Sequence, residues 1–157
     1  MNIEAFTGRA QAYTKARPSY PAEAVEYIYN LAPNNAVFAD IGAGTGKFTE
    51  LLARYGNALF AVEPNADMLE QLKIILAPFP NTKIVDGSAE PTKLPDGIVD
   101  VIINAQSLNR FDIEAFKAEC RRIGKPNPLV VTLYNDEPPY GNLRYNKSTG
   151  ALYHKPI

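Results

Sequence analysis

The sequence has few of the residues from which disulfides, metal centres and hydrolytic triads are built. Of its 157 residues, only one is cysteine and one is histidine. Cys120 has no partner for an internal disulfide, and its position one helical turn after Phe116 predicts a small core side chain. His154 has no cysteine or histidine companion, so no metal site is expected. No serine has a histidine at a meaningful spacing, so a hydrolase triad is unsupported.

The sequence also lacks a large charge of either sign and lacks any long apolar run. Its 16 basic and 17 acidic side chains give a net charge of -1, which offers no surface for nucleic acid or membrane. No apolar run approaches the length needed to cross a bilayer, and residues 1–6 lack the basic and apolar regions of a leader. We therefore expect a cytoplasmic protein whose residues 1–157 form a single domain.

The most informative feature that is present is a run of three glycines at alternate positions. Gly42, Gly44 and Gly46 follow the apolar run 36–39 and Asp40. They leave a strand-to-helix turn without Cβ atoms, so a ligand can approach the backbone closely. A second apolar run, 58–62, ends at Glu63, and an acid at the end of the next strand can accept hydrogen bonds from a ribose diol. Together these features predict a pocket for an adenosine-containing cofactor.

The glycine spacing argues against two other nucleotide-binding motifs. The dinucleotide fingerprint, Gly-x-Gly-x-x-Gly, would place its third glycine where the chain has Lys47. The P-loop would begin with a glycine where the chain has Ile41, and would follow its lysine with Ser or Thr where the chain has Phe48. A nicotinamide-dependent oxidoreductase is therefore the least supported alternative.

At these residues the chain resembles the class I, Rossmann-like S-adenosylmethionine-dependent methyltransferases, and within them the small type 11 group. Residues 40–46 match the family's first motif, acid-x-Gly-x-Gly-x-Gly, and Glu63 matches its ribose-binding acid. Further matching segments are residues 6–21, 86–90, 94–95 and 99–106. The resemblance runs from about Phe6 to Asn135, and the order of these segments makes it fairly specific.

The resemblance implies a set of cofactor-binding residues. Asp40 would lie near the amino-acid end of S-adenosyl-L-methionine, and Glu63 would take the ribose hydroxyls. Arg9 and Tyr13 would share one helix face in a segment that folds over the pocket, with Arg9 able to pair with the methionyl carboxylate; a solvated surface pair is the alternative. The expected set is Arg9, Tyr13, Asp40, Gly42, Ala43, Gly44, Gly46, Glu63, Pro64, Met68, Ser88, Ala89, Asn104, Ala105 and Gln106.

The sequence departs from the family's pattern in three places. Ser88 stands where the family commonly has an aspartate that accepts from the adenine amino group, and serine accepts more weakly. Residues 108–111 replace a His-aromatic pair found in many relatives, so no catalytic residue is predicted. The resemblance also implies a C-terminal part longer than this chain provides, since only residues 136–157 follow the fifth strand.

Two hypotheses for function follow from this resemblance. The first is an S-adenosylmethionine-dependent methyltransferase that acts on a small-molecule acceptor and leaves S-adenosyl-L-homocysteine as product. The alternative is a cofactor-binding, methyltransferase-like domain or a truncated remnant without turnover. The departures at Ser88 and at residues 108–110, together with the short tail, favour the alternative.

The alternation of apolar patterns predicts an α/β fold: a three-layer, Rossmann-like sheet of about five mostly parallel strands with helices on both faces. Strands are expected over 36–41, 58–62, 83–86, 99–105 and 129–134, and helices at Pro21, after Gly46, and at the caps Asn65 and Asp112. Residues 1–32 would form a lid and helix, 33–135 the core, and 136–157 an irregular or hairpin tail.

The open edge of the fifth strand leads to a further expectation. A hairpin of residues 142–146 and 151–154 would cover that edge. If the tail is irregular instead, the chain is either a monomer or pairs with a second copy along the edge.

Overall fold

The computed structural model of the chain describes residues 20–134, 144–146 and 151–153. Its centre is a sheet of five parallel strands in the order β3-β2-β1-β4-β5. The strands are β1 (Phe38–Ile41), β2 (Leu59–Glu63), β3 (Thr82–Asp86), β4 (Val99–Ala105) and β5 (Gly124–Leu133). The helices are α2 (Ala22–Leu31), α3 (Lys47–Ala53), α4 (Ala66–Leu76), the 3₁₀ turn η2 (Leu108–Arg110) and α5 (Ile113–Ile123).

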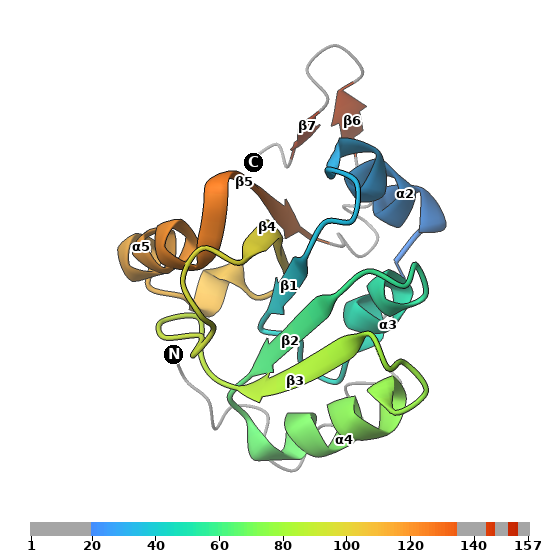
Figure 1. The fold of residues 1–157 in the computed structure, drawn as a ribbon, viewed down its shortest axis with the longest axis vertical. Coiled ribbons are helices and arrows are strands. Elements are labelled where there is room, and N and C mark those ends of the chain that lie inside the picture. Colours follow the sequence, from blue (N-terminus) through green and yellow to red (C-terminus); the bar gives the residue numbers. More distant parts are fainter. Residues whose placement is uncertain (1–19, 135–143, 147–150, 154–157) are drawn as a thin grey trace.

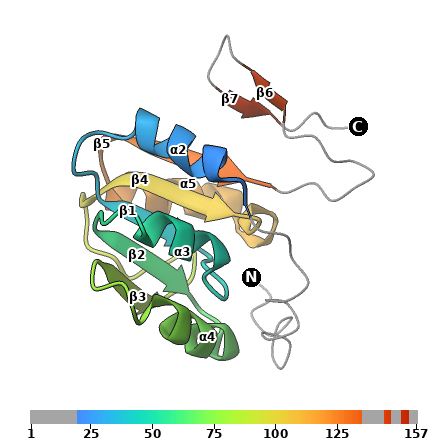
Figure 2. The same ribbon diagram turned by 90° about the vertical axis from the view of Figure 1, so that its right-hand side faces the viewer.

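Helices cover both faces of this sheet (Figures 1 and 2). On one face, apolar side chains of α2, α3 and α4 pack on β1, β2 and β4 in one core cluster. On the other face, a second cluster joins α5 and the segment between β3 and β4 to the same strands. The strand order, the parallel pairing and the helices on both faces confirm the predicted α/β, Rossmann-like fold.

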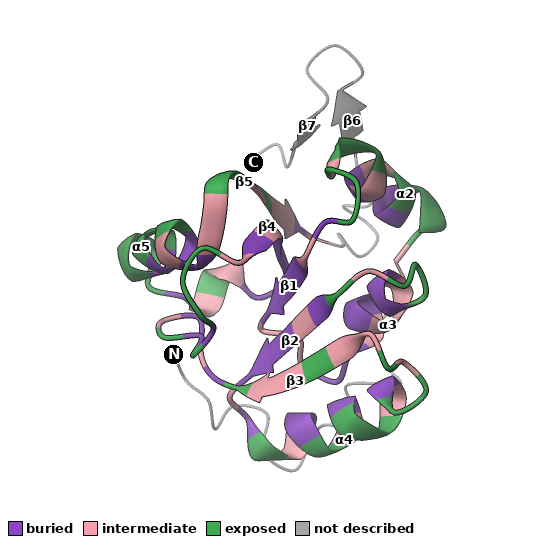
Figure 3. Cartoon of the chain, viewed as in Figure 1, coloured by how far each residue is buried: buried purple, intermediate pink, exposed green. Residues whose placement is uncertain are grey.

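Strand β1 occupies the middle of the sheet and is buried along its whole length (Figure 3). It begins two residues later than the apolar run suggested, because the preceding residues make other contacts. The amide of Ala36 donates to the carbonyl of Pro33 at 3.2 Å, and the amide of Val37 donates to Asp100 Oδ2 at 2.8 Å. The strand therefore carries its one acid, Asp40, into the interior at its carboxyl end.

The expected helix caps are confirmed. Asn65 precedes α4 and accepts from the amide of Met68 at 3.1 Å, and Asp112 precedes α5 and accepts from the amide of Ala115 at 3.0 Å. Each bond satisfies one of the amide groups that a helix start leaves unpaired. The caps thus fix where the chain turns back after β2 and after η2.

The segment that crosses from β3 to β4 is held against α5 by a charged cluster. Glu119 on α5 accepts from the amide and hydroxyl of Thr92 at 2.8 and 2.6 Å. Arg122 donates to Glu119 at 2.9 and 2.6 Å and also pairs with Asp96. The described segment between β3 and β4 contains no helix, and these bonds hold it over the sheet.

Strand β5 differs from the prediction at its start. It begins at Gly124 rather than at 129, because Gly124 already pairs with Val99, and the register then shifts before Leu129 pairs with Val101. The bulged stretch contains Pro126 and Pro128, which an edge strand tolerates because one side of it needs no ladder bonds.

The backbone of the tail forms the expected hairpin but does not extend the main sheet. Strand β6 (Arg144–Asn146) pairs antiparallel with β7 (Ala151–Tyr153). These two described strands form a separate sheet and neither pairs with β5. The expectation that the hairpin covers the edge of β5 is therefore wrong for the described strands.

Candidate functional site

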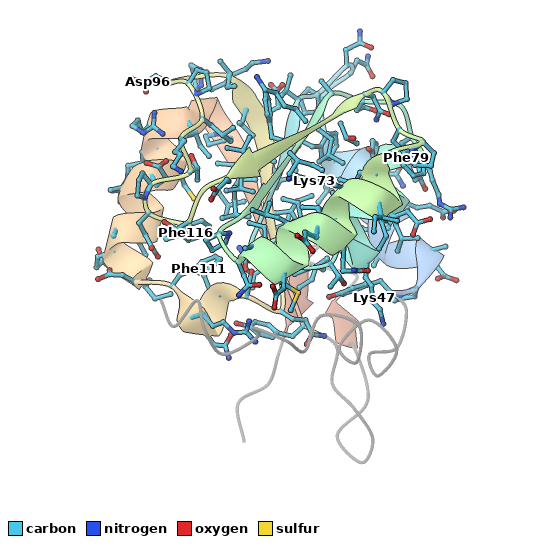
Figure 4. The ribbon with its side chains drawn as sticks, turned by 90° about the horizontal axis from the view of Figure 1, so that it is seen from below. Lys47, Lys73, Phe79, Asp96, Phe111 and Phe116 are labelled. Carbon is cyan, nitrogen blue, oxygen red and sulfur yellow. The ribbon has the colours of Figure 1, made fainter. Side chains whose placement is uncertain are left out.

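A pocket opens where β1 ends and the glycine loop leads into α3. The residues that line it are Tyr20, Asp40, Gly42, Ala43, Gly44, Thr45, Lys47, Phe48 and Ala105. Lys47 and Phe111 lie at this end of the molecule, whereas Asp96 and Phe79 lie toward the opposite end (Figure 4). The pocket is thus at the carboxyl ends of the parallel strands, where open α/β sheets bind ligands.

Two glycines of the loop have different physical roles. Gly42 has φ +74°, and a Cβ there would lie 2.8 Å from the Cβ of Ser107. Ser107 cannot easily move away, since it is buried and its hydroxyl donates to the carbonyl of Ile41 at 3.0 Å. Gly44 has φ +59°, but a Cβ there would meet nothing within 4 Å. Gly42 therefore serves close packing of the loop on the chain after β4, and Gly44 leaves open space beside the pocket.

Glu63 is fixed to the glycine loop by its own carboxylate. Its Oε2 accepts from the amide of Gly44 at 2.8 Å and its Oε1 accepts from the amide of Asn65 at 2.9 Å. Burial raises the pKa of Glu63, and the two amide bonds and the charge of Arg110 oppose the rise. Each carboxylate oxygen can accept a second hydrogen bond, so the carboxylate joins β2 to the loop and keeps acceptor capacity for a ligand.

Asp40 is the other acid of the site and is only 1% exposed. Its Oδ2 accepts from the hydroxyl of Thr49 on α3 at 2.7 Å. Its Oδ1 has no hydrogen-bond partner within the described part of the chain. Burial raises the pKa of Asp40 to about 7, Glu63 adds to the rise, and the hydrogen bond from Thr49 opposes it.

The structure brings six of the expected residues together. Asp40, Gly42, Ala43, Gly44 and Ala105 line the pocket, and Glu63 is bonded to one of these residues. Gly46 caps α3 beside them, and a Cβ there would lie 2.7 Å from Leu72 Cδ1.

Other expected residues lie in the same region but do not line this pocket. Ala89 and Met68 are 1% and 3% exposed and pack in the core. Asn104 is fully buried, and its Nδ2 approaches the carbonyl of Val131 at 3.4 Å. Ser88 is turned to the carbonyl of Pro91.

Four further expected residues complete the set. Pro64 directly follows Glu63 and is partly buried. Gln106 has a φ of +59° and its amide donates to the carbonyl of Leu133 at 2.8 Å, which ends β4 sharply. Arg9 and Tyr13 lie outside the described residues.

Sequence reasoning missed several residues of the pocket. Tyr20 and Phe48 place two rings at its wall, with centroids 4.8 Å apart in an edge-to-face arrangement. Lys47 adds a cation to the lining, and Thr49 holds Asp40. For Lys47 and Thr49, the only signal in the sequence was their position in the first turn of the helix after Gly46.

Two other features, a metal cluster and a membrane-spanning helix, are absent from the described ranges. No group of three or more His, Cys, Asp or Glu side chains there could hold a metal ion. Within those same ranges, no helix has the length and apolar character needed to cross a membrane.

Comparison with known protein sequences identifies close family relationships. The model of the family described as "Methyltransferase domain" matches residues 39–132. An uncharacterized methyltransferase of Mycobacterium tuberculosis is 34% identical over 130 residues, which cover 83% of this chain and 51% of that protein. An uncharacterized methyltransferase-like protein of Schizosaccharomyces pombe is 31% identical over 138 residues, 86% of this chain and 53% of that protein. The chain thus spans about half the length of these curated relatives.

Solved structures share the same architecture. A protein from Anaeromyxobacter dehalogenans described as a type II methyltransferase has a TM-score of 0.68 at 30% identity, over 83% of this chain and 52% of that chain. The geranyl diphosphate C-methyltransferase of Streptomyces coelicolor, solved with Mg²⁺, geranyl diphosphate and S-adenosyl-L-homocysteine, has a TM-score of 0.64 at 17% identity, over 72% and 45%; this shows the fold alone. From the family match and the relatives above 30% identity, the chain belongs to the methyltransferase-domain family of the class I methyltransferases, as its glycine motif predicted.

Proposed function

We propose that the chain binds S-adenosyl-L-methionine in the pocket at the ends of β1 and β2 and serves transfer of its methyl group to a small-molecule acceptor. The observation that carries the proposal is the bond from the Gly44 amide to the Glu63 carboxylate at 2.8 Å. It joins the open glycine loop to an acid that can accept from a ribose. S-adenosyl-L-methionine bound in this pocket would therefore contact the glycine loop and the Glu63 carboxylate together.

The residues present fit the parts of this cofactor. Gly44 leaves open space for close approach to the backbone, and Glu63 accepts from the ribose hydroxyls. Asp40 offers a free carboxylate oxygen to the cationic amino end. The bound cofactor supplies a methyl group already activated by its sulfonium, so the protein's main contribution is alignment and exclusion of water.

The remaining expected contacts are part of the same proposal. Ala43 and Ala105 contribute the pocket wall, and Pro64 and Met68, with Ser88 and Ala89, would border the adenosine. Arg9 and Tyr13 would close over the methionyl end. The solved S. coelicolor enzyme, which shares the fold, holds S-adenosyl-L-homocysteine, and this supports the choice of ligand.

The first test is a calorimetric titration of residues 1–157 with S-adenosyl-L-methionine, S-adenosyl-L-homocysteine and, as control, NAD. We expect binding of the two adenosyl ligands alone and its loss in Glu63→Ala. Glu70→Ala, which removes an exposed carboxylate of α4, should bind like the parent chain. Binding of NAD, or of none of the three, would contradict the proposed cofactor.

A second test separates methyl transfer from binding without turnover. The chain is incubated with methyl-tritiated S-adenosyl-L-methionine and pools of small hydroxyl, amine and carbon acceptors. Tritium in a small-molecule product that depends on Glu63 supports the methyltransferase. Cofactor binding without transfer to any pool would favour the alternative, a methyltransferase-like binding domain.

A further inference from the structure

One buried acid of the pocket is held at one oxygen and free at the other. Asp40 is 1% exposed, its Oδ2 accepts from Thr49 at 2.7 Å, and its Oδ1 has no partner among the described residues. A buried carboxylate oxygen without a donor is costly, and in a native structure such a group calls for an explanation, for example a donor on a bound water, ion or ligand. Asp40 also lines the pocket, so its unpartnered oxygen is the candidate acceptor for a donor on a ligand there.

Thr49 determines which oxygen is free. It is the third residue of α3 and is fully buried. A threonine hydroxyl has one proton to donate, and within a helix it commonly donates to its own backbone. Here that proton goes to Asp40 Oδ2 instead. The hydroxyl therefore fixes the rotation of the carboxylate and leaves Oδ1 as the oxygen without a partner among the described residues.

The groups around Asp40 set its charge. Burial raises the pKa of Asp40, the hydrogen bond from the Thr49 hydroxyl lowers it, and the charge of Glu63, at the end of the neighbouring strand β2, raises it further. The resulting pKa of Asp40 is about 7. Lys47 on α3 and the phenol of Tyr20 line the same pocket. From β4, the residue level with Asp40 is the apolar Ile103. At neutral pH, Asp40 is thus divided between its protonated and ionised forms.

We propose that Thr49 is a positioning residue that presents Asp40 to the cationic amino end of the ligand, and that ligand binding releases a proton from Asp40. The inference rests on the proposed function, because it takes an adenosyl amino acid as the ligand. An ammonium group beside Oδ1 favours the ionised carboxylate over the protonated one. Affinity and proton release are then linked.

The test uses S-adenosyl-L-homocysteine and calorimetry in phosphate and Tris buffers, whose different ionisation heats report the protons released. At pH 7 the parent chain should release about half a proton for each ligand bound, and affinity should fall about tenfold from pH 8 to pH 6. Both effects should be absent in Asp40→Asn, which cannot titrate.

Thr49 is tested with substitutions that keep the shape of the side chain. Thr49→Val removes the donor, so Asp40 should protonate more readily: binding at pH 7 should weaken about tenfold, and the midpoint of the pH profile should rise. Thr49→Ser restores the donor and should return the profile toward the parent's. Thr82→Val is the matched control, because the Thr82 hydroxyl donates only to the carbonyl of Phe79 at 2.8 Å, at the start of β3.

Each outcome bears on a different part of the proposal. Binding that is equal at pH 6 and pH 8, without proton release, overturns the inference and leaves the proposed function standing. A Thr49→Val chain that binds more weakly by the same factor at every pH shows Thr49 to be structural only. No binding by the folded parent chain at any pH overturns the proposed cofactor, and this inference with it.

Discussion

The backbone amide of Gly44 donates to the Oε2 of Glu63 at 2.8 Å, although Gly44 lies in the loop after β1 and Glu63 is the last residue of β2. The amide of Asn65 donates to the other oxygen of the same carboxylate. The acid at the end of β2 is thus a structural tie for the glycine loop as well as a candidate ligand group. Its removal should affect both stability and binding.

Glu63→Gln should therefore reduce both properties. The amide nitrogen of glutamine would face a backbone N–H that now meets a carboxylate oxygen, so we expect the free energy of unfolding to fall by about 1–3 kcal/mol. Binding of S-adenosyl-L-homocysteine should weaken by more than about tenfold. Urea denaturation and calorimetry measure the two effects, with Glu70→Gln as control. Parent-like binding in Glu63→Gln would argue against a ribose contact.

The two glycines that flank Ala43 should respond differently to alanine. Gly42→Ala combines a positive φ with a Cβ only 2.8 Å from Ser107 Cβ, so the free energy of unfolding should drop by more than about 2 kcal/mol. Gly44→Ala meets open space and should cost only about 1 kcal/mol, yet its methyl group would occupy space beside the pocket. We expect a folded Gly44→Ala chain with little affinity for the adenosyl ligands. If both variants lose the same free energy of unfolding, the assignment of Gly42 to packing and of Gly44 to ligand access is contradicted.

The sequence predicted the parts of the site that follow from local chemistry. Asp40, the glycine loop and Glu63 could be placed because apolar runs of strand length end at these residues. Asn65 and Asp112 could be assigned as caps because their short side chains reach a backbone amide three residues on.

The parts that were missed depend on how elements are rotated against one another. The bond between Thr49 and Asp40 requires the face of α3 that carries Thr49 to point at β1, which no spacing specifies. Asn104 was expected in the pocket because it lies at the carboxyl end of the fourth strand, one residue before β4 ends. Successive strand residues point to opposite faces, so Ala105 lines the pocket while Asn104 does not.

The cluster around Glu119 predicts a loss of stability in acid. Hydrogen bonds from Arg122, and then from Thr92, lower the pKa of Glu119 from 4.5 to about 2. A lowered pKa stabilises the fold above the unfolded value, and this contribution is lost as pH falls from about 4.5 through about 2. Glu119→Gln should reduce the free energy of unfolding at pH 7 by about 1–3 kcal/mol.

The difference in the free energy of unfolding between Glu119→Gln and the parent chain should become smaller in acid, because the parent chain loses the stabilisation that Glu119 provides. Denaturant titrations at pH 7, 4 and 3 measure it. Glu114→Gln is the control, since Glu114 pairs with Lys117 at the surface and is 80% exposed. If the difference in the free energy of unfolding is the same at all three pH values, the charge of Glu119 does not contribute to holding the segment between β3 and β4 against α5.

Asp40 predicts the opposite dependence on pH, because the fold raises its pKa instead of lowering it. The folded chain keeps a proton that the unfolded chain loses, so this group destabilises the fold progressively as pH rises from 3.8 to about 7. Asp40→Asn removes the buried charge and keeps an oxygen for the Thr49 hydroxyl. It should raise the free energy of unfolding at pH 8 by about 1–3 kcal/mol and change it little at pH 4. Denaturant titrations at both pH values measure this effect, and Asp100→Asn, which alters a partly exposed acid paired with Lys125, should not show it.

A buried acid that destabilises the fold at neutral pH needs another reason to be there. If Asp40→Asn is more stable and binds S-adenosyl-L-homocysteine more weakly than the parent chain at pH 8, that reason is the ligand; if it is less stable at pH 8, Asp40 belongs to the core.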